Sequence, residues 1–194
     1  MSKLLYGVGV NNSDYVVSLY RRVNGKVVKT WACPFYVRWS NMIRRCYSSK
    51  YLATRNNYRA CKVCNEWLTF SNFKAWMEKQ DWQGKDLDKD HLSNSGIYSP
   101  NTCVFLDPMV NNFIIDAGSI RGDYPIGVSF NKYHGKFIAK CNNPFKNKTE
   151  YLGYYSDADK AHIAWKKRKL ELACQLADLQ TDQRVAEALR VRYL

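Results

Sequence analysis

The sequence contains no long hydrophobic run. Its longest apolar stretch is a handful of residues, whereas a membrane-spanning helix needs about 20 apolar residues in succession. The amino-terminal segment Met1–Gly7 also lacks an extended apolar stretch and a small-residue cleavage site, the two marks of a secretory signal. We therefore expect a cytoplasmic protein with no membrane partner.

Low-complexity tracts and internal repeats are also missing. Hydrophobic residues make up 46% of the 194 residues and aromatic residues 14%, a composition that excludes intrinsic disorder. The chain is long enough for one large domain or two small ones with a real core. In the cytosol, the seven cysteines are expected to be free thiols or metal ligands rather than disulfides.

Acidic charge is scarce in the first 60 residues, and the formal net charge of the chain is +13. Residues 1–60 carry 11 basic residues and 1 acidic residue, residues 61–120 carry 5 and 8, and residues 121–194 carry 14 and 8. Basic arms suit a polyanion, and an acidic centre suits a hard cation. The distribution favours a metal-dependent enzyme acting on nucleic acid; the alternative is a merely basic protein with a solvated surface.

Local patterns predict a mixture of strands and helices. Alternating apolar residues over 14–31, interrupted by Asn24-Gly25, predict a β-hairpin. A helix is expected from Pro34, then a loop over 48–60, and then a helix capped by Ser71 and ended at Gln83-Gly84. Two short strands are expected within 85–107, around a loop at 93–100, and a short helix from Pro108.

The carboxy-terminal part is expected to form a second domain after a linker at 117–125. Three strands are expected at 126–130, 136–141 and 150–155. A capping box with Ser156 at the N-cap and Asp159 three residues later predicts the start of a long helix.

The acidic middle contains residues suited to phosphodiester hydrolysis. Asp88-Lys89-Asp90-His91 is followed by Asn101 and then by Asn111-Asn112. A carboxylate with an amide or imidazole holds one hard cation and leaves positions open for phosphate and water, while a neighbouring base activates the water. Taken alone, the same residues also fit solvated surface charge and a helix cap.

Longer motifs in this region resemble the HNH endonucleases of tailed bacteriophages, many of which are free-standing homing endonucleases. The resemblance spans residues 30–116 and rests on segments that include Cys33-Pro34-x-Tyr36-x-x-Trp39, Cys61-x-Val63-Cys64-x-Glu66-Trp67, Leu87-Asp88-Lys89-Asp90 and Tyr98-Ser99-Pro100-x-Thr102-Cys103. It implies a ββα-metal fold, Mg²⁺ or Mn²⁺ as the catalytic cation, and DNA strand cleavage in a host cytoplasm.

The resemblance assigns roles to individual residues. Asp88 corresponds to a metal ligand, Lys89 to the usual basic histidine, Asn101 to the middle asparagine and Asn111 to the last ligand. Asp90-His91 offers a second Asp-His register two residues later, so Asp90 is a further candidate ligand and His91 a further candidate base. Imidazole titrates near neutrality, whereas a lysine becomes a base only when its pKa is lowered. For the helix ligand, Asn112 and Asp116 remain alternatives.

Four cysteines are candidate ligands for a structural zinc ion. Cys61 and Cys64 have the spacing of a zinc knuckle, and Cys33 and Cys46 lie upstream within the resemblance. Cys103 competes for the fourth position, and buried free cysteines are the alternative interpretation.

The last 70 residues resemble the three-strand-plus-helix DNA-binding domain of plant ethylene-response factors. The likeness rests on Gly127-Val128-Ser129-Phe130, Gly135-Lys136-Phe137, Leu152-Gly153-Tyr154-Tyr155 and Ala164-Trp165. It implies a sheet that enters the major groove, with Lys132, Lys136, Lys140, Lys146 and Lys148 at phosphates and with Tyr133, Phe137, Tyr151 and Tyr154 divided between core and DNA. An accessory domain that only stabilises the nuclease is the alternative.

Together these patterns predict an α+β protein with a ββα-metal HNH domain at 1–120 and a three-stranded antiparallel sheet plus helix at 121–194. The expected function is metal-dependent, site-selective cleavage of double-stranded DNA, as a nick or a double-strand cut, without a small-molecule substrate. Arg38, Arg44 and Arg45 are further candidate phosphate contacts on the first helix. The alternative is a catalytically inactive DNA-binding protein with the same fold. The oligomeric state is left open.

Overall fold

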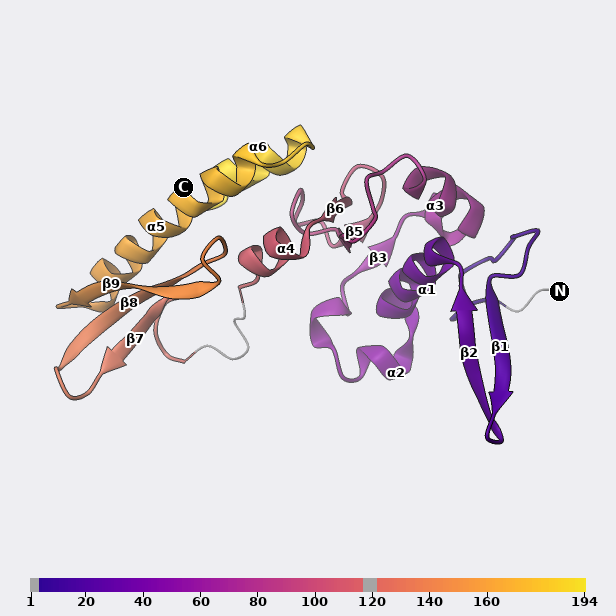
Figure 1. Ribbon diagram of the computed structural model, residues 1–194, viewed down its shortest axis with the longest axis horizontal. Coiled ribbons are helices and arrows are strands. Elements are labelled where there is room, and N and C mark those ends of the chain that lie inside the picture. Colours follow the sequence, from indigo (N-terminus) through magenta and orange to yellow (C-terminus); the bar gives the residue numbers. More distant parts are fainter. Residues whose placement is uncertain (1–3, 117–121) are drawn as a thin grey trace. The chain divides into compact units, whose positions relative to one another are not determined.

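The computed structural model describes residues 4–116 and 122–194 as a mixed α+β protein (Figure 1). The chain divides into two compact units, one up to Leu106 and one from Asp107 onward. Helix α4 (Pro108–Ile114), which was expected in the first domain, therefore lies in the second unit. Of the expected linker, residues 117–121 lie outside the described ranges.

The first unit combines short strands with helices. Its strands are β1 (Ser18–Val23), β2 (Lys26–Ala32), β3 (Lys62–Val63), β4 (Asp86–Asp88), β5 (Ile97–Tyr98) and β6 (Val104–Leu106). Its helical segments are α1 (Pro34–Tyr47), α2 (Ser49–Leu52), η1 (Asn56–Tyr58), η2 (Asn65–Leu68) and α3 (Phe70–Met77). The second unit contains α4, β7 (Val128–Asn131), β8 (Lys136–Asn143), β9 (Lys148–Tyr155), α5 (Ala158–Asp178) and α6 (Gln183–Val191).

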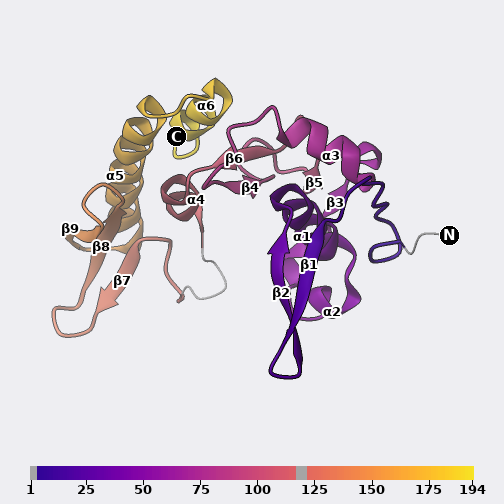
Figure 2. The ribbon, with the colours of Figure 1, turned by 45° about the vertical axis from the view of Figure 1, so that its right-hand side comes forward.

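The amino-terminal hairpin forms at the expected place. β1 and β2 pair antiparallel around Asn24-Gly25, whose φ angles of 47° and 76° are those that a tight hairpin turn requires. A register shift between Leu19 and Tyr20 interrupts the ladder. Figures 1 and 2 show the hairpin projecting from the unit beside α1.

An aromatic core holds the helices of the first unit together. Trp39 of α1 and Trp67 of η2 are fully buried, and the indole Nε1 of Trp39 donates to the carbonyl of Trp67 over 2.7 Å. Phe73 of α3 lies edge-on to Trp67 with ring centroids 5.1 Å apart. The helix expected from Pro34 is confirmed, and its residues Trp39, Met42, Ile43 and Cys46 are all buried.

Three expectations for the first unit are wrong in detail. Residues 48–60 contain α2 and η1 rather than only loop, and Ser48 caps α2 by accepting from the backbone N–H of Tyr51. Helix α3 begins at Phe70, with Thr69 rather than Ser71 at its N-cap. It ends at Met77, well before Gly84, because its buried face consists of Phe70, Phe73 and Met77 and nothing apolar extends it.

The segment 85–107 contains the expected pair of strands. β4 and β6 are antiparallel, with Asp88 opposite Val104. The connection between them was expected to be a loop, but it contains β5, which pairs parallel with β3. Residue Asp107 alone separates β6 from α4, so strand, loop, strand and helix follow in direct succession.

The second unit is a three-stranded antiparallel sheet covered by a helix. The strand order is β7-β8-β9, and α5 packs on one face of the sheet. Trp165 of α5 is buried beside Gly127, which has a φ of +80°. Figure 1 shows α5 running along the sheet, and α6 folds back against α5, with the ring centroids of Tyr193 and Trp165 6.0 Å apart.

The ends of the long helix differ slightly from the expectation. Asp157, not Ser156, is the N-cap, and its carboxylate accepts from the backbone N–H of Lys160 over 2.7 Å. β8 extends through Asn143, past the expected strand end at residue 141. A break after Asp178 starts the separate helix α6, capped by Asp182.

Replacing Gly127 is expected to destabilise the second unit strongly. An added Cβ would lie 2.0 Å from Cδ1 of Trp165, and the positive φ would strain any other residue. We expect Gly127→Ala to lower the free energy of unfolding by about 2–5 kcal/mol, measured by urea denaturation. The matched control is Gly135→Ala, also at positive φ (+60°) but with open space around it, for which about 1 kcal/mol is expected. Equal losses in both variants would show that the contact with Trp165 is unimportant.

No helix within residues 4–116 and 122–194 is long and apolar enough to cross a membrane.

Candidate active site and nucleic-acid interface

Asp88 lies at the end of β4 and organises the turn that follows. Its Oδ1 accepts hydrogen bonds from the backbone N–H groups of Asp90 (2.9 Å) and His91 (2.6 Å). Such a turn fixes the direction of the carboxylate, because two backbone donors hold one of its oxygens. No described hydrogen bond uses Oδ2 of Asp88, and a hard cation prefers a carboxylate oxygen of this kind.

Lys89 points inward from the same turn. Only 5% of the residue is exposed, and its Nζ lies 5.8 Å and 5.5 Å from the ring centroids of Tyr58 and Tyr98. The ammonium group donates to both carboxylate oxygens of Asp90, at 2.5 and 2.6 Å. Sequence patterns did not predict that Tyr58, Tyr98 and Asp90 surround this ammonium group, because Tyr58 is 31 residues away along the chain.

The protonation of Lys89 follows from these contacts. Burial opposes the charge of the ammonium group, but the hydrogen bond and negative charge of Asp90 outweigh it, so the pKa of Lys89 lies above its usual value. A lysine acts as a base near neutral pH only when its pKa is lowered. Lys89 therefore has the properties of a structural cation, and Asp90 is occupied as its counter-ion.

The remaining candidates of the acidic middle lie at different places. His91 is buried, with 5% of the residue exposed. It follows Asp88 by three residues, and its backbone N–H donates to the Asp88 carboxylate. Asn101 is exposed in the turn after β5. Asn111 and Asn112 lie on α4, in the second unit, whereas Asp88 belongs to the first.

Three of the four candidate zinc ligands have described neighbours. Cys33 lies 3.5 Å from the hydroxyl of Tyr15, and the thiol of Cys61 points at the carbonyl of Asn57. Burial, together with the nearby Cys61, raises the pKa of Cys46 to about 12. Among the described residues, no group of three or more His, Cys, Asp or Glu side chains is placed to hold a metal ion. The zinc site stays a prediction.

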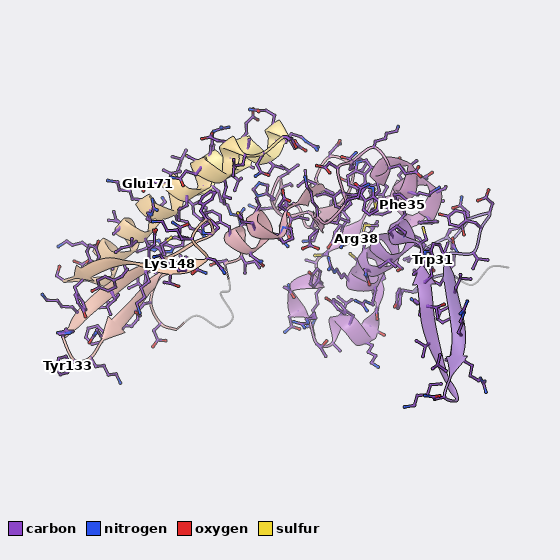
Figure 3. All side chains as sticks on the ribbon, viewed as in Figure 1. Trp31, Phe35, Arg38, Tyr133, Lys148 and Glu171 are labelled. Carbon is purple, nitrogen blue, oxygen red and sulfur yellow. The ribbon has the colours of Figure 1, made fainter. Side chains whose placement is uncertain are left out.

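Of the three candidate arginines on α1, only Arg44 is exposed. Arg38 donates to the carbonyl of Lys85 over 2.6 Å and lies 3.4 Å from the carboxylate of Asp86. Figure 3 labels Arg38 on α1. Arg45 lies over the ring of Tyr58, with 5.8 Å to the centroid. Arg38 and Arg45 thus connect parts of the first unit, and Arg44 is the one of the three that faces solvent.

One face of the three-stranded sheet carries exposed basic and aromatic side chains. Lys140 is opposite Tyr151 in the ladder, and Lys136 is at the other end of the same strand. Tyr151 and Tyr154 are 53% and 44% exposed, and their ring centroids lie 5.6 Å apart. The turn from β7 to β8 adds Lys132 and Tyr133, which is 91% exposed and lies at the tip in Figure 3.

The opposite face of the sheet packs against α5. Phe137 is half-buried and opposite Phe130 in the ladder, with ring centroids 5.0 Å apart. Glu150 accepts from the guanidinium of Arg168 on α5 at 2.7 Å. The hydrogen bond from Arg168, with a second from Asn143, lowers the pKa of Glu150 to about 2. The sheet is thereby fixed to the helix, and the basic and aromatic side chains of its other face are exposed.

Two of the five candidate lysines lie away from that exposed face. Lys146, in the turn between β8 and β9, is 3.4 Å from the carboxylate of Glu150. Lys148 is opposite Asn143 and lines a pocket on the α5 side of the sheet. Lys132, Lys136 and Lys140 are therefore the better placed candidates for phosphate contacts.

Two cations of the second unit bind the end of α4. The ammonium group of Lys169 on α5 donates to the carbonyl of Phe113 over 2.7 Å, and Arg192 donates to the carbonyl of Ile114 over 3.3 Å. Burial lowers the pKa of Lys169 to about 8. The last carbonyls of a helix have no partner within it and carry partial negative charge. These two contacts explain why α4 belongs to the second unit.

Comparisons with protein-family models, curated proteins and solved structures find no match to this chain.

Proposed function

We propose that the chain is a metal-dependent, site-selective DNA endonuclease of the HNH type. The observation that supports this most directly is the turn after β4, where Oδ1 of Asp88 accepts from the backbone of residues 90 and 91 and Oδ2 takes no part in these hydrogen bonds. This turn lies between two antiparallel strands that a helix follows at once. The same order of elements and residues underlies the resemblance to phage homing endonucleases.

In this proposal Asp88 holds Mg²⁺ or Mn²⁺, and the role of Asn111 as a further ligand comes from the resemblance alone. The cation supplies charge stabilisation at the phosphate. His91 accepts the proton of the attacking water, and Asn101 orients the groups near it. Lys89 keeps the turn folded, because its ammonium group is enclosed by Tyr58, Tyr98 and Asp90. The exposed face of β7-β8-β9 selects and binds the duplex.

A catalytically inactive DNA-binding protein is the second candidate. The burial of Lys89 favours it, since a buried, ion-paired lysine occupies the position of the usual base. Nicking of supercoiled plasmid by the full chain with magnesium or manganese, compared with excess chelator, separates the two. Cleavage that depends on the metal supports the endonuclease; binding without cleavage under every metal condition supports the inactive protein.

The two candidate bases are expected to respond differently to substitution. At neutral pH, His91→Ala is expected to lower single-turnover cleavage by about 10²–10⁴-fold, the usual effect of losing a general base. Lys89→Met should lower it by less than about tenfold, because a protonated lysine contributes no base. Rescue by added imidazole in the His91 variant alone would strengthen the assignment. If the Lys89 variant instead cleaves more slowly than the His91 variant, while circular dichroism shows that it is folded, Lys89 is the essential residue.

Structural zinc is a separate proposal. We expect about one zinc ion per chain in freshly purified protein, held by Cys33, Cys46, Cys61 and Cys64. Elemental analysis combined with thiol titration checks this. All seven thiols reactive in denaturant, with no zinc released, would contradict it. The catalytic cation is exchangeable and would be lost in such a preparation.

A further inference from the structure

The β1–β2 hairpin, residues 18–32 and here called the ribbon, is exposed on both faces. Every residue from Leu19 to Trp31 is exposed, including Tyr20 at 57% and Val27 at 66%. An isolated two-stranded hairpin is only marginally stable in water, and exposed apolar side chains in a cluster mark an interaction site. The core of the first unit leaves the ribbon out, since only its flanking residues Val17 and Cys33 join that core.

The ribbon is also strongly basic. It carries Arg21, Arg22, Lys26 and Lys29, and neither Asp nor Glu occurs anywhere in residues 15–65. The cross-strand pairs place cations on both faces, because Arg21 is opposite Val28 while Arg22 is opposite Val27. Lys29 lies 5.7 Å from the ring centroid of Tyr20. Each face therefore mixes positive charge with apolar and aromatic groups.

This distribution matches duplex DNA better than other partners. The major groove is wide enough to admit a two-stranded β-ribbon, with phosphates on either side of it. A membrane-surface element would separate an apolar face from a charged one, which this ribbon does not. Pairing with the ribbon of a second copy would bring like charges together along the strands.

Further exposed cations lie in the same unit. They follow the ribbon along α1, α2 and η1 and are Arg44, Lys50, Arg55 and Arg59. The ribbon and α2 extend to the same side of the first unit in Figures 1 and 2. A DNA duplex lying along that side would contact the cations of both elements.

We propose that the ribbon is a second DNA-binding element, which inserts into the major groove of the duplex. This inference rests on the proposed function, because it takes duplex DNA as the partner. The cations contact phosphates along the groove walls, and Tyr20, Val27 and Val28 lie against base edges and sugars. Contacts by two separate elements would lengthen the DNA segment that the protein reads.

The test compares two full-length variants that each lose three positive charges. The ribbon variant is Arg21→Gln/Arg22→Gln/Lys26→Gln; the control is Lys79→Gln/Lys160→Gln/Lys167→Gln, at exposed positions on other elements. Binding to a 30-base-pair duplex is measured in chelator between about 50 and 300 mM salt, a range in which phosphate contacts dominate the salt dependence. Chelator prevents cleavage, so that only binding is observed.

For the ribbon variant, we expect the slope of log affinity against log salt to fall by about two to three. The affinity at 100 mM salt should fall on the order of 10²-fold. The control slope should change by less than about one. A p-benzoylphenylalanine at position 20 should crosslink to the duplex, and one at position 79 should not. A melting temperature of the ribbon variant within a few degrees of wild type is also expected, since the ribbon is outside the core.

Other results would overturn the proposal. If the salt slope of the ribbon variant is unchanged while the wild type binds and cleaves DNA, the ribbon is not a DNA-binding element, but the proposed endonuclease function stands. Failure of the wild type to bind duplex at any salt rejects both. Loss of dimerisation in sedimentation, or of binding to vesicles of anionic lipid, without a change in DNA slope would assign the ribbon to a second copy or to a membrane. Unfolding of the ribbon variant would show that the ribbon belongs to the core.

Discussion

Asp88→Asn is expected to reduce metal-dependent cleavage by at least about 10³-fold, because a Lewis acid contributes several kcal/mol to the transition state. Asparagine keeps an oxygen that can accept from the backbone N–H groups of Asp90 and His91, so the turn should survive. The negative charge that would hold the proposed cation is lost. Single-turnover cleavage of plasmid with magnesium measures the effect.

Two comparisons isolate the loss of the cation from a loss of structure. Asp88→Ala removes both the charge and the turn acceptor, so it should be equally inactive and less stable by about 1–2 kcal/mol. DNA affinity in chelator should stay within a few fold of wild type for both variants, since the basic arms are unaltered. An Asn variant that cleaves at the wild-type rate would remove Asp88 from the metal site.

Deleting residues 121–194 is expected to abolish cleavage as well as to weaken DNA binding. The sequence alone suggests that the chemistry would survive, because the deleted part holds no candidate catalytic ligand. In the structure, however, Lys169 and Arg192 bind the last carbonyls of α4. A helix of 7 residues without those partners is too short to be stable by itself. Asn111 would then have no fixed position.

A full-length variant distinguishes loss of the helix end from loss of the sheet. Lys169→Met/Arg192→Met keeps β7-β8-β9 and removes both donors to α4. We expect its cleavage rate to fall by about 10-fold or more, a change of 1.4 kcal/mol or more in the barrier, with DNA affinity within a few fold of wild type. A truncated protein that still nicks plasmid at full rate would show that α4 needs nothing from residues 121–194.

Much of the local structure could be predicted because local chemistry decides it. Asn24-Gly25 predicts a hairpin since few other dipeptides adopt two positive φ angles. The apolar spacing of α1 and the strands of the second unit follow the same logic. Helix ends are less predictable, because Asp157 and Ser156 are both good N-caps and only the final geometry selects between them.

The candidate site was predictable in its residue types but not in its contacts. Asp88 and His91 stand out by chemistry and spacing, and the carboxylate of Asp88 accepts from the backbone N–H of His91. The pairing of β3 with β5 joins segments 35 residues apart. That kind of contact depends on the whole fold, and it brings Tyr98 toward Lys89. The same applies to Arg38 and Arg45, whose partners lie on other elements.

The separation of the ribbon from the core also affects how the protein opens. Amide protons exchange with solvent through local openings whose free energy depends on how much buried surface each opening exposes. Trp39 and Phe73 become exposed only when the first unit unfolds as a whole. The ribbon has almost no buried surface to lose, so its ladder opens without disturbing α1. A bound duplex would keep the hydrogen bonds between β1 and β2 closed. Slower exchange of individual ribbon amides would then show, residue by residue, that the ribbon occupies the groove.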